Sequence, residues 1–130
     1  MNFVEEIISF ANSALEEILD DSGHFLYSGA STLRPGAVYL LGHNPGGSPA
    51  GREDESIRRS LNELPDKKTN NYIDDSWVNR PAGQSSLQVR VCWLLENIGF
   101  DPREVCASNL IFSRSVDAAN INFEKFANIC

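Results

Sequence analysis

The sequence predicts an α/β fold, in which helices alternate with the strands of a mainly parallel sheet. Two short apolar runs, residues 37–41 and residues 105–112, have the length and composition of buried strands. Helical patterns precede, separate and follow these runs, an alternation that is typical of a parallel sheet covered by helices. Because ligands bind such sheets at the carboxyl ends of the strands, we expect a site where the two runs end.

Size and composition indicate one globular domain, residues 1–130. The 130 residues are enough to bury a core, and the hydrophobic content of 42% is close to the globular average. No apolar run approaches the roughly 20 residues that cross a bilayer. The acidic, amphipathic N-terminal segment does not have the pattern of a secretory signal. We therefore expect a cytoplasmic protein that does not enter the membrane.

The cysteines and the net charge limit the kinds of site and partner that we expect. Cys92, Cys106 and Cys130 are widely spaced and fit neither a disulfide framework nor a metal site, so we expect no metal and no other cofactor. The net charge of −7 counts against strong non-specific DNA binding, which normally needs basic residues. A local basic face is compatible with this balance, because the distribution of charge matters more than its total.

The first half of the chain begins with the clearest helix pattern, residues 3–19. Apolar residues recur there at steps of three and four, the glutamates lie off that stripe, and residues 20–23 end it. Residues 22–36 contain several turn residues and are expected to connect this helix to the strand at residues 37–41.

The second half contains the other expected helices. A short charged helix is predicted over residues 53–63, and a long polar loop over residues 65–84, of a kind that is more often functional or mobile. Residues 85–98 form the second strong helix, where Ser85 and Gln88 can make a capping box. Its leucines, valine and isoleucine at helical spacing predict one apolar face. A last helix is expected to start near residue 122.

The loop after the first strand has the composition of a ligand-binding turn. Pro45 fixes the backbone, and Gly46 lets a ligand approach the main chain closely. Asn44 can donate and accept hydrogen bonds at once, so it can hold a water or a ligand hydroxyl. His43 can perform acid–base chemistry or contribute only its backbone N–H. The alternative is a tight strand-to-helix turn, and the loop has neither a dinucleotide fingerprint nor a Walker lysine.

Three other residues could contact a ligand. Asn109 lies inside the second apolar strand and needs a partner, either a base edge or a neighbouring loop backbone. Trp77, with Tyr72 nearby, can stack on a planar ligand or fold back onto the core. Arg114 follows the second strand and can meet a phosphate, although a solvated arginine is the simpler expectation.

These residues resemble a known family. Residues 40–46, Leu-Leu-Gly-His-Asn-Pro-Gly, resemble the first motif of the uracil-DNA glycosylase superfamily in the Gly-x-Asn-Pro-Gly form of its mismatch-specific and single-strand-selective branches. Residues 94–105 followed by residues 107–111 are similar to the family's helix, turn and second strand, which ends in an asparagine. Parts of residues 77–84 are loosely similar to the segment before that helix. The resemblance thus covers roughly residues 37–112.

The resemblance implies a three-layer α/β/α sandwich and a metal-independent DNA glycosylase that removes uracil or a related base. It implies that Asn44 positions the water that attacks the sugar C1′. The backbone around Gly42 and His43 would contact the base, Asn109 would bond its Watson–Crick edge, and Trp77 would stack on it. The base-binding set carried over by the resemblance is Gly42, His43, Pro45, Gly46, Asn109 and Trp77.

The chain also departs from the family. A second catalytic motif, with a His or Asn near Pro and Ser, is not found before Cys130, and His24 precedes the first motif and is not expected to supply it. We therefore expect either the N-terminal portion of a longer protein or a shortened relative that no longer excises bases. Two rival functions stay open: a silent domain of this fold that binds nucleic acid, a nucleotide or a protein, and an unrelated α/β enzyme acting on a small metabolite. DNA is the expected partner, and an incomplete sheet makes a homo-oligomer plausible.

Overall fold

The protein combines helices with a small parallel sheet. A computed structural model describes residues 2–52, 54–116, 119 and 121–130. In chain order the α-helices, 3-10 helices (η) and strands are α1 (Phe3–Ala14), η1 (Ala30–Thr32), β1 (Tyr39–Gly42), α2 (Ile57–Glu63), η2 (Leu64–Asp66), α3 (Asn71–Asp74), α4 (Ser86–Asn97), η3 (Pro102–Glu104), β2 (Cys106–Asn109) and α5 (Phe123–Ile129). Every helix in the described part of the chain is too short or too polar to cross a lipid bilayer.

The two strands pair in parallel, as the sequence predicts. Tyr39 lies opposite Cys106, and Gly42 lies opposite Asn109. The pairing continues past the strand ends, where the N–H of Leu110 donates to the Gly42 carbonyl over 2.9 Å. Within the described residues the sheet has these two strands. The loops after β1 and β2 therefore leave the sheet side by side, which brings both predicted site segments to one end of it.

The segment before the first motif runs along the outer edge of β2. The N–H of Tyr27 donates to the carbonyl of Ala107 over 2.8 Å, and the N–H of His24 donates to that of Phe112 over 3.1 Å. Gly23 allows this close approach, because a Cβ there would collide with the Phe112 carbonyl. Residues 22–28 are thus part of the scaffold, and they carry the rings of His24 and Tyr27 toward the strand ends.

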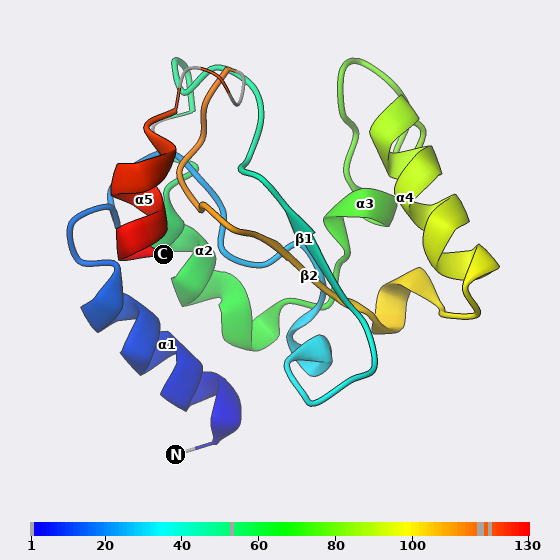
Figure 1. Cartoon of the computed structure of the whole chain (residues 1–130), viewed down its shortest axis with the longest axis horizontal. Coiled ribbons are helices and arrows are strands. Elements are labelled where there is room, and N and C mark those ends of the chain that lie inside the picture. Colours follow the sequence, from blue (N-terminus) through cyan, green and yellow to red (C-terminus); the bar gives the residue numbers. More distant parts are fainter. Residues whose placement is uncertain (1, 53, 117–118, 120) are drawn as a thin grey trace.

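The helices lie on both sides of the strand pair. In the view of Figure 1, α1, α2 and α5 lie on one side and α3 and α4 on the other. The buried core cluster on the first side consists of Ala11, Leu15, Ile18, Leu19, Ile57 and Leu61, with Phe126 and Ile129 packed against it. These buried side chains come from α1, the turns after it and α2. Their packing fixes the side of the sheet on which the segment at residues 22–28 begins.

The first predicted helix is shorter than expected. The α-helix ends at Ala14 rather than at residue 19, and turns cover residues 15–20. The periodic stripe still reaches the core, since Leu15 and Ile18 are each 3% exposed. Turns rather than a continued helix place both side chains against α2, and this tertiary packing overrides the local pattern.

The predicted loop at residues 65–84 also needs correction, since it contains η2 and α3. The Asn70 side chain caps α3 by accepting from the N–H of Tyr72 over 2.9 Å, and it donates to the Pro102 carbonyl over 3.2 Å. A single helical turn of four residues, Asn71–Asp74, is too short to produce a periodic pattern. This turn positions the residues that follow it at the site.

Helix α4 has the predicted capping box, formed by Ser85 and Gln88. Its buried side differs from the predicted apolar face: Gln88 is fully buried and Leu95 is 3% exposed, whereas Leu87 and Ile98 are at least half exposed. The cause is polar. The Gln88 amide donates to the backbone carbonyls of residues 71 and 75 over 2.9 and 2.8 Å, so this row of the helix faces α3.

Candidate functional site

A cleft of about 1070 Å³ opens at the carboxyl ends of β1 and β2. Asn44 from the loop after β1, Asn109 from the end of β2 and Trp77 from the segment after α3 all line it. Gly42, His43 and Gly46 line it as well, whereas Pro45 is buried behind the loop. The structure therefore brings the predicted side chains together around one cavity, although they come from distant parts of the chain.

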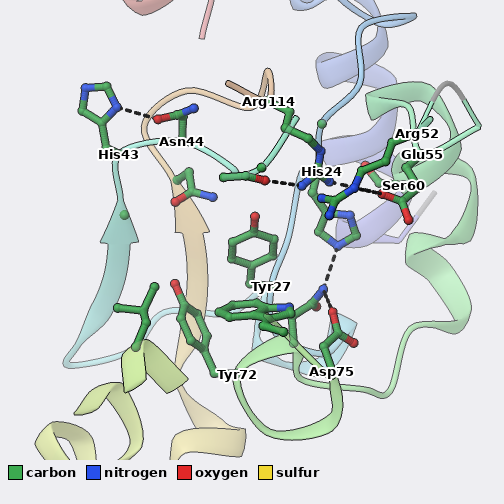
Figure 2. Close-up of a pocket in the computed structure, with 18 of the residues that line it drawn as sticks. His24, Tyr27, His43, Asn44, Arg52, Glu55, Ser60, Tyr72, Asp75 and Arg114 are labelled. Atoms are coloured by element: carbon green, nitrogen blue, oxygen red, sulfur yellow. Dashed lines mark hydrogen bonds and ion pairs between the residues drawn. The ribbon is translucent and has the colours of Figure 1, made fainter. Parts of the chain in front are cut away.

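Asn44 is held by its own loop. Its Oδ1 lies 2.9 Å from Nδ1 of His43, so an imidazole with its proton on Nδ1 donates to the amide oxygen. Its Nδ2 donates to the Pro45 carbonyl over 3.0 Å. The exposed His43 ring packs on Phe123, with 5.3 Å between centroids, and Figure 2 shows it pointing away from His24. His43 thus orients Asn44 rather than facing the floor of the cleft.

Asn109 presents an unsatisfied amide. The residue is 6% exposed, and its Oδ1 packs so closely on Gly42 that a Cβ there would collide with it. Its Nδ2 is buried and has no hydrogen-bond partner among the described residues. Leaving such a donor unpaired costs about 1–3 kcal/mol. A ligand acceptor in the cleft would remove this cost.

Aromatic rings form the floor and one wall of the cleft. Tyr27 stacks on His24 with 5.2 Å between ring centroids and meets the edge of Tyr72 at 5.7 Å. Trp77 lies 5.4 Å from Tyr72 and 6.1 Å from Tyr27. Figure 2 shows the Tyr27 hydroxyl in the middle of the cleft, directed toward the loop that carries Asn44. The rings offer flat apolar surfaces beside the polar amides, which suits a planar ligand with a polar edge.

Burial keeps three side chains of the cleft uncharged at pH 7, those of Tyr27, Tyr72 and His24. It raises the pKa of Tyr27 to about 12, an effect that the nearby Arg114 guanidinium opposes. Burial also raises the pKa of Tyr72. It lowers the pKa of His24 to about 4, and the charges of Lys67 and Arg114 lower it further. The two phenols therefore remain O–H donors, and His24 is an uncharged imidazole.

His24 joins a polar chain that fixes α3. Its Nε2 lies 3.4 Å from the Nδ2 of Asn71, which also donates to Asp75 over 2.9 Å. Lys67 donates to the Asn71 Oδ1 over 2.6 Å. No sequence pattern indicates that His24 and Tyr27 belong to a site, because they lie in a segment rich in turn residues. The signal that could have found them is the pairing of that segment with β2, which a single sequence does not display.

Arg114 is not the solvated arginine that we expected. Its side chain is 11% exposed. It donates to the Gly46 carbonyl over 2.6 Å and to the Ser22 hydroxyl over 3.1 Å. It also lies 3.5 Å from a carboxylate oxygen of Glu55, to which Arg52 comes within 3.9 Å. Arg114 thus ties the loop after β1 to the segment before η1.

The rim of the cleft carries mixed charge. The charged residues that line it in the described part of the chain are Arg52, Arg59, Arg114, Asp54, Glu55, Glu63 and Asp75. Arginines and carboxylates therefore largely balance, and the rim is not the basic surface that would grip many phosphates. None of the cysteines lines the cleft, and no group of three or more His, Cys, Asp or Glu among the described residues could hold a metal ion.

We compared the chain with protein-family models, with curated proteins and with solved structures, and none of the three comparisons found a match.

Proposed function

We propose that the chain belongs to the uracil-DNA glycosylase superfamily and hydrolyses the N-glycosidic bond of uracil or a related base in DNA. One observation carries the proposal: the Asn44 and Asn109 amides, from two distant segments, line the same cleft beside an aromatic wall. Asn109 is buried with a free amide donor, which is the kind of group that reads the edge of a base. The family resemblance assigns the water to Asn44 and the stacking to Trp77, and both residues line this cleft.

In the proposed reaction the base leaves the DNA stack and enters the cleft. Trp77 stacks on it, and Asn109 bonds its Watson–Crick edge. Asn44, held by His43, still has a lone pair on Oδ1 with which to orient a water. The C1′–N bond breaks, its electron pair stays on the base, and the water oxygen bonds to C1′ and loses a proton. Because an amide is a poor general base, slow turnover is expected.

The proposal extends to fold, partner and location. The parallel pair of β1 and β2 would belong to a three-layer α/β/α sandwich of the glycosylase type. The partner would be DNA in the cytoplasm, bound mainly by the flipped base, because the rim of the cleft has little net charge. Affinity should therefore fall only weakly with added salt.

The test is an excision assay on uracil-containing single- and double-stranded DNA. Wild-type protein should release uracil, and Asn44→Ala should lower the rate by about 100-fold, within the range typical of losing one group that positions a reactant. Asn62→Ala is the matched control, because Asn62 is an exposed residue of α2 that does not line the cleft. Activity that survives Asn44→Ala unchanged would remove Asn44 from the mechanism.

A second candidate is a domain that binds a base or nucleotide without excising it. Two observations favour it: both ends of the Asn44 amide are already bonded within the loop, and carboxylates line the cleft together with the arginines. Fluorescence anisotropy with a labelled uracil-containing single strand separates the two functions. This candidate requires binding that Asn109→Ala abolishes, with no free uracil after prolonged incubation.

A further inference from the structure

The Tyr27 hydroxyl occupies a position in the cleft that the proposed reaction has not yet used. It points into the middle of the cavity (Figure 2), while the ring below it forms part of the floor. The Asn109 side chain lies beside this hydroxyl, but within the described residues its Nδ2 makes no hydrogen bond to it or to any other group. A phenol that is aimed into a cavity beside an unpaired amide donor is available to a ligand.

The Tyr27 ring is fixed from several directions. His24 stacks on it at 5.2 Å, and Tyr72 and Trp77 confine it from the other sides. Its backbone is bonded on both flanks, since its N–H donates to Ala107 over 2.8 Å and its carbonyl accepts from the N–H of Asn71 over 2.7 Å. The hydroxyl is therefore held in place before any ligand arrives, which is the condition for stabilising charge in a transition state.

We infer that the Tyr27 hydroxyl donates a hydrogen bond to a carbonyl oxygen of the bound base and stabilises the negative charge that the base gains as the glycosidic bond breaks. This role rests on the proposed glycosylase function. The electron pair of the C1′–N bond moves onto the base and spreads to its carbonyl oxygens. Tyr27 keeps its proton throughout, and the base anion later takes a proton from water.

The environment of Tyr27 suits this role. Burial raises its pKa, so the hydroxyl stays a proton donor at neutral pH. The Arg114 guanidinium is close enough to act on it electrostatically, and this positive charge favours an anion formed beside the hydroxyl. Asn109 shares the same part of the cleft, so one ligand edge can meet both groups.

The experiment measures single-turnover excision of uracil and of 5-fluorouracil by wild type and by Tyr27→Phe. The substitution keeps the ring and its packing, and an unchanged thermal midpoint verifies the fold. The expected result is a loss of about 100-fold on uracil, since removing one such donor costs about 10²–10³-fold. The loss should be several-fold smaller on 5-fluorouracil, whose anion is more stable and needs less help. Tyr39→Phe is the control, because the Tyr39 hydroxyl lies outside the cleft and bonds the Arg34 carbonyl.

The outcomes separate this inference from the proposed function. Wild-type protein that releases neither base overturns both. Excision by wild type that Tyr27→Phe leaves unchanged overturns the role of Tyr27 alone. An equal loss on the two bases also overturns it, because a merely structural defect would not depend on the leaving group.

Discussion

At the scale of single residues, the site depends on a close contact between two strands. Gly42 and Asn109 are paired across the sheet, and the Asn109 Oδ1 rests where a Cβ of residue 42 would be. The absent side chain of Gly42 therefore sets the direction in which the Asn109 amide points. Steric fit at this pair links the loop after β1 to Asn109, the residue that we propose binds the base edge.

Gly42→Ala tests that link. The added methyl must displace the Asn109 side chain, so we expect base excision to fall at least tenfold and the free energy of unfolding to fall by about 1–3 kcal/mol. Denaturant unfolding and the excision assay measure the two effects. Gly36→Ala is the matched control, since a Cβ there meets atoms no closer than 3.9 Å. Equal behaviour of the two variants would contradict the proposed contact.

At the scale of elements, hydrogen bonds from residues 22–28 hold β2 and α3 together. His24 and Tyr27 project from this segment, and its backbone bonds reach Ala107, Phe112 and Asn71. The Asn71 side chain carries the connection on to Lys67 and Asp75. The position of α3, and with it the aromatic wall, thus depends on a partly buried, neutral histidine.

Acid should weaken this connection in a defined window. The pKa of His24 is about 4 in the folded chain, below its ordinary value of 6.5. Its contribution to stability is therefore complete above pH 6.5 and is lost as the pH falls toward 4. Arg103 lowers the pKa of Asp74 to about 2, so the contribution of Asp74 to stability is present throughout this range and is lost only as the pH falls from 3.8 toward 2.

Denaturant unfolding between pH 7 and pH 4.5 measures this loss. Wild type should lose on the order of 2 kcal/mol across the window, and His24→Gln should lose clearly less. His43→Gln should keep the wild-type dependence, because that exposed ring lies outside the network. A wild-type slope in His24→Gln would show that other groups cause the acid sensitivity.

The elements also show what a single sequence can predict. Long patterns predicted the presence of α1 and α4, although α1 ends earlier than its pattern and α4 buries a different side. The glycine-rich loop indicated one half of the cleft. The one-turn α3 was missed because four residues carry no periodicity. The burial of Gln88 and the involvement of Tyr27 were missed because both depend on partners far away in the chain.

At the scale of the whole molecule, several surfaces expose apolar side chains, among them α4 and β1. The large exposed side chains of α4, its C-cap and β1 include Trp93, Leu94, Ile98, Tyr39 and Leu41, all at least 47% exposed. Within the described residues no strand pairs with the outer edge of β1. Surfaces of this kind favour association with another chain.

Self-association is therefore expected. Sedimentation velocity should show a dimer or larger species that dissociates on dilution, and Trp93→Glu should shift the population toward monomer. Phe3→Glu serves as the control, since Phe3 is a similarly exposed aromatic residue on the distant helix α1. A wild-type protein that is monomeric at every concentration would contradict this expectation.

We propose that residues of the cleft between Asn44 and Asn109 hydrolyse the N-glycosidic bond of a base in DNA. Incubation of the wild-type protein with uracil-containing single-stranded DNA in H₂¹⁸O, followed by mass spectrometry, tests it most directly. The expected products are free uracil and an abasic sugar that carries one ¹⁸O atom, and both should decrease strongly in Asn44→Ala. Intact DNA with no free uracil after long incubation, from protein that is shown to be folded, would contradict the claim.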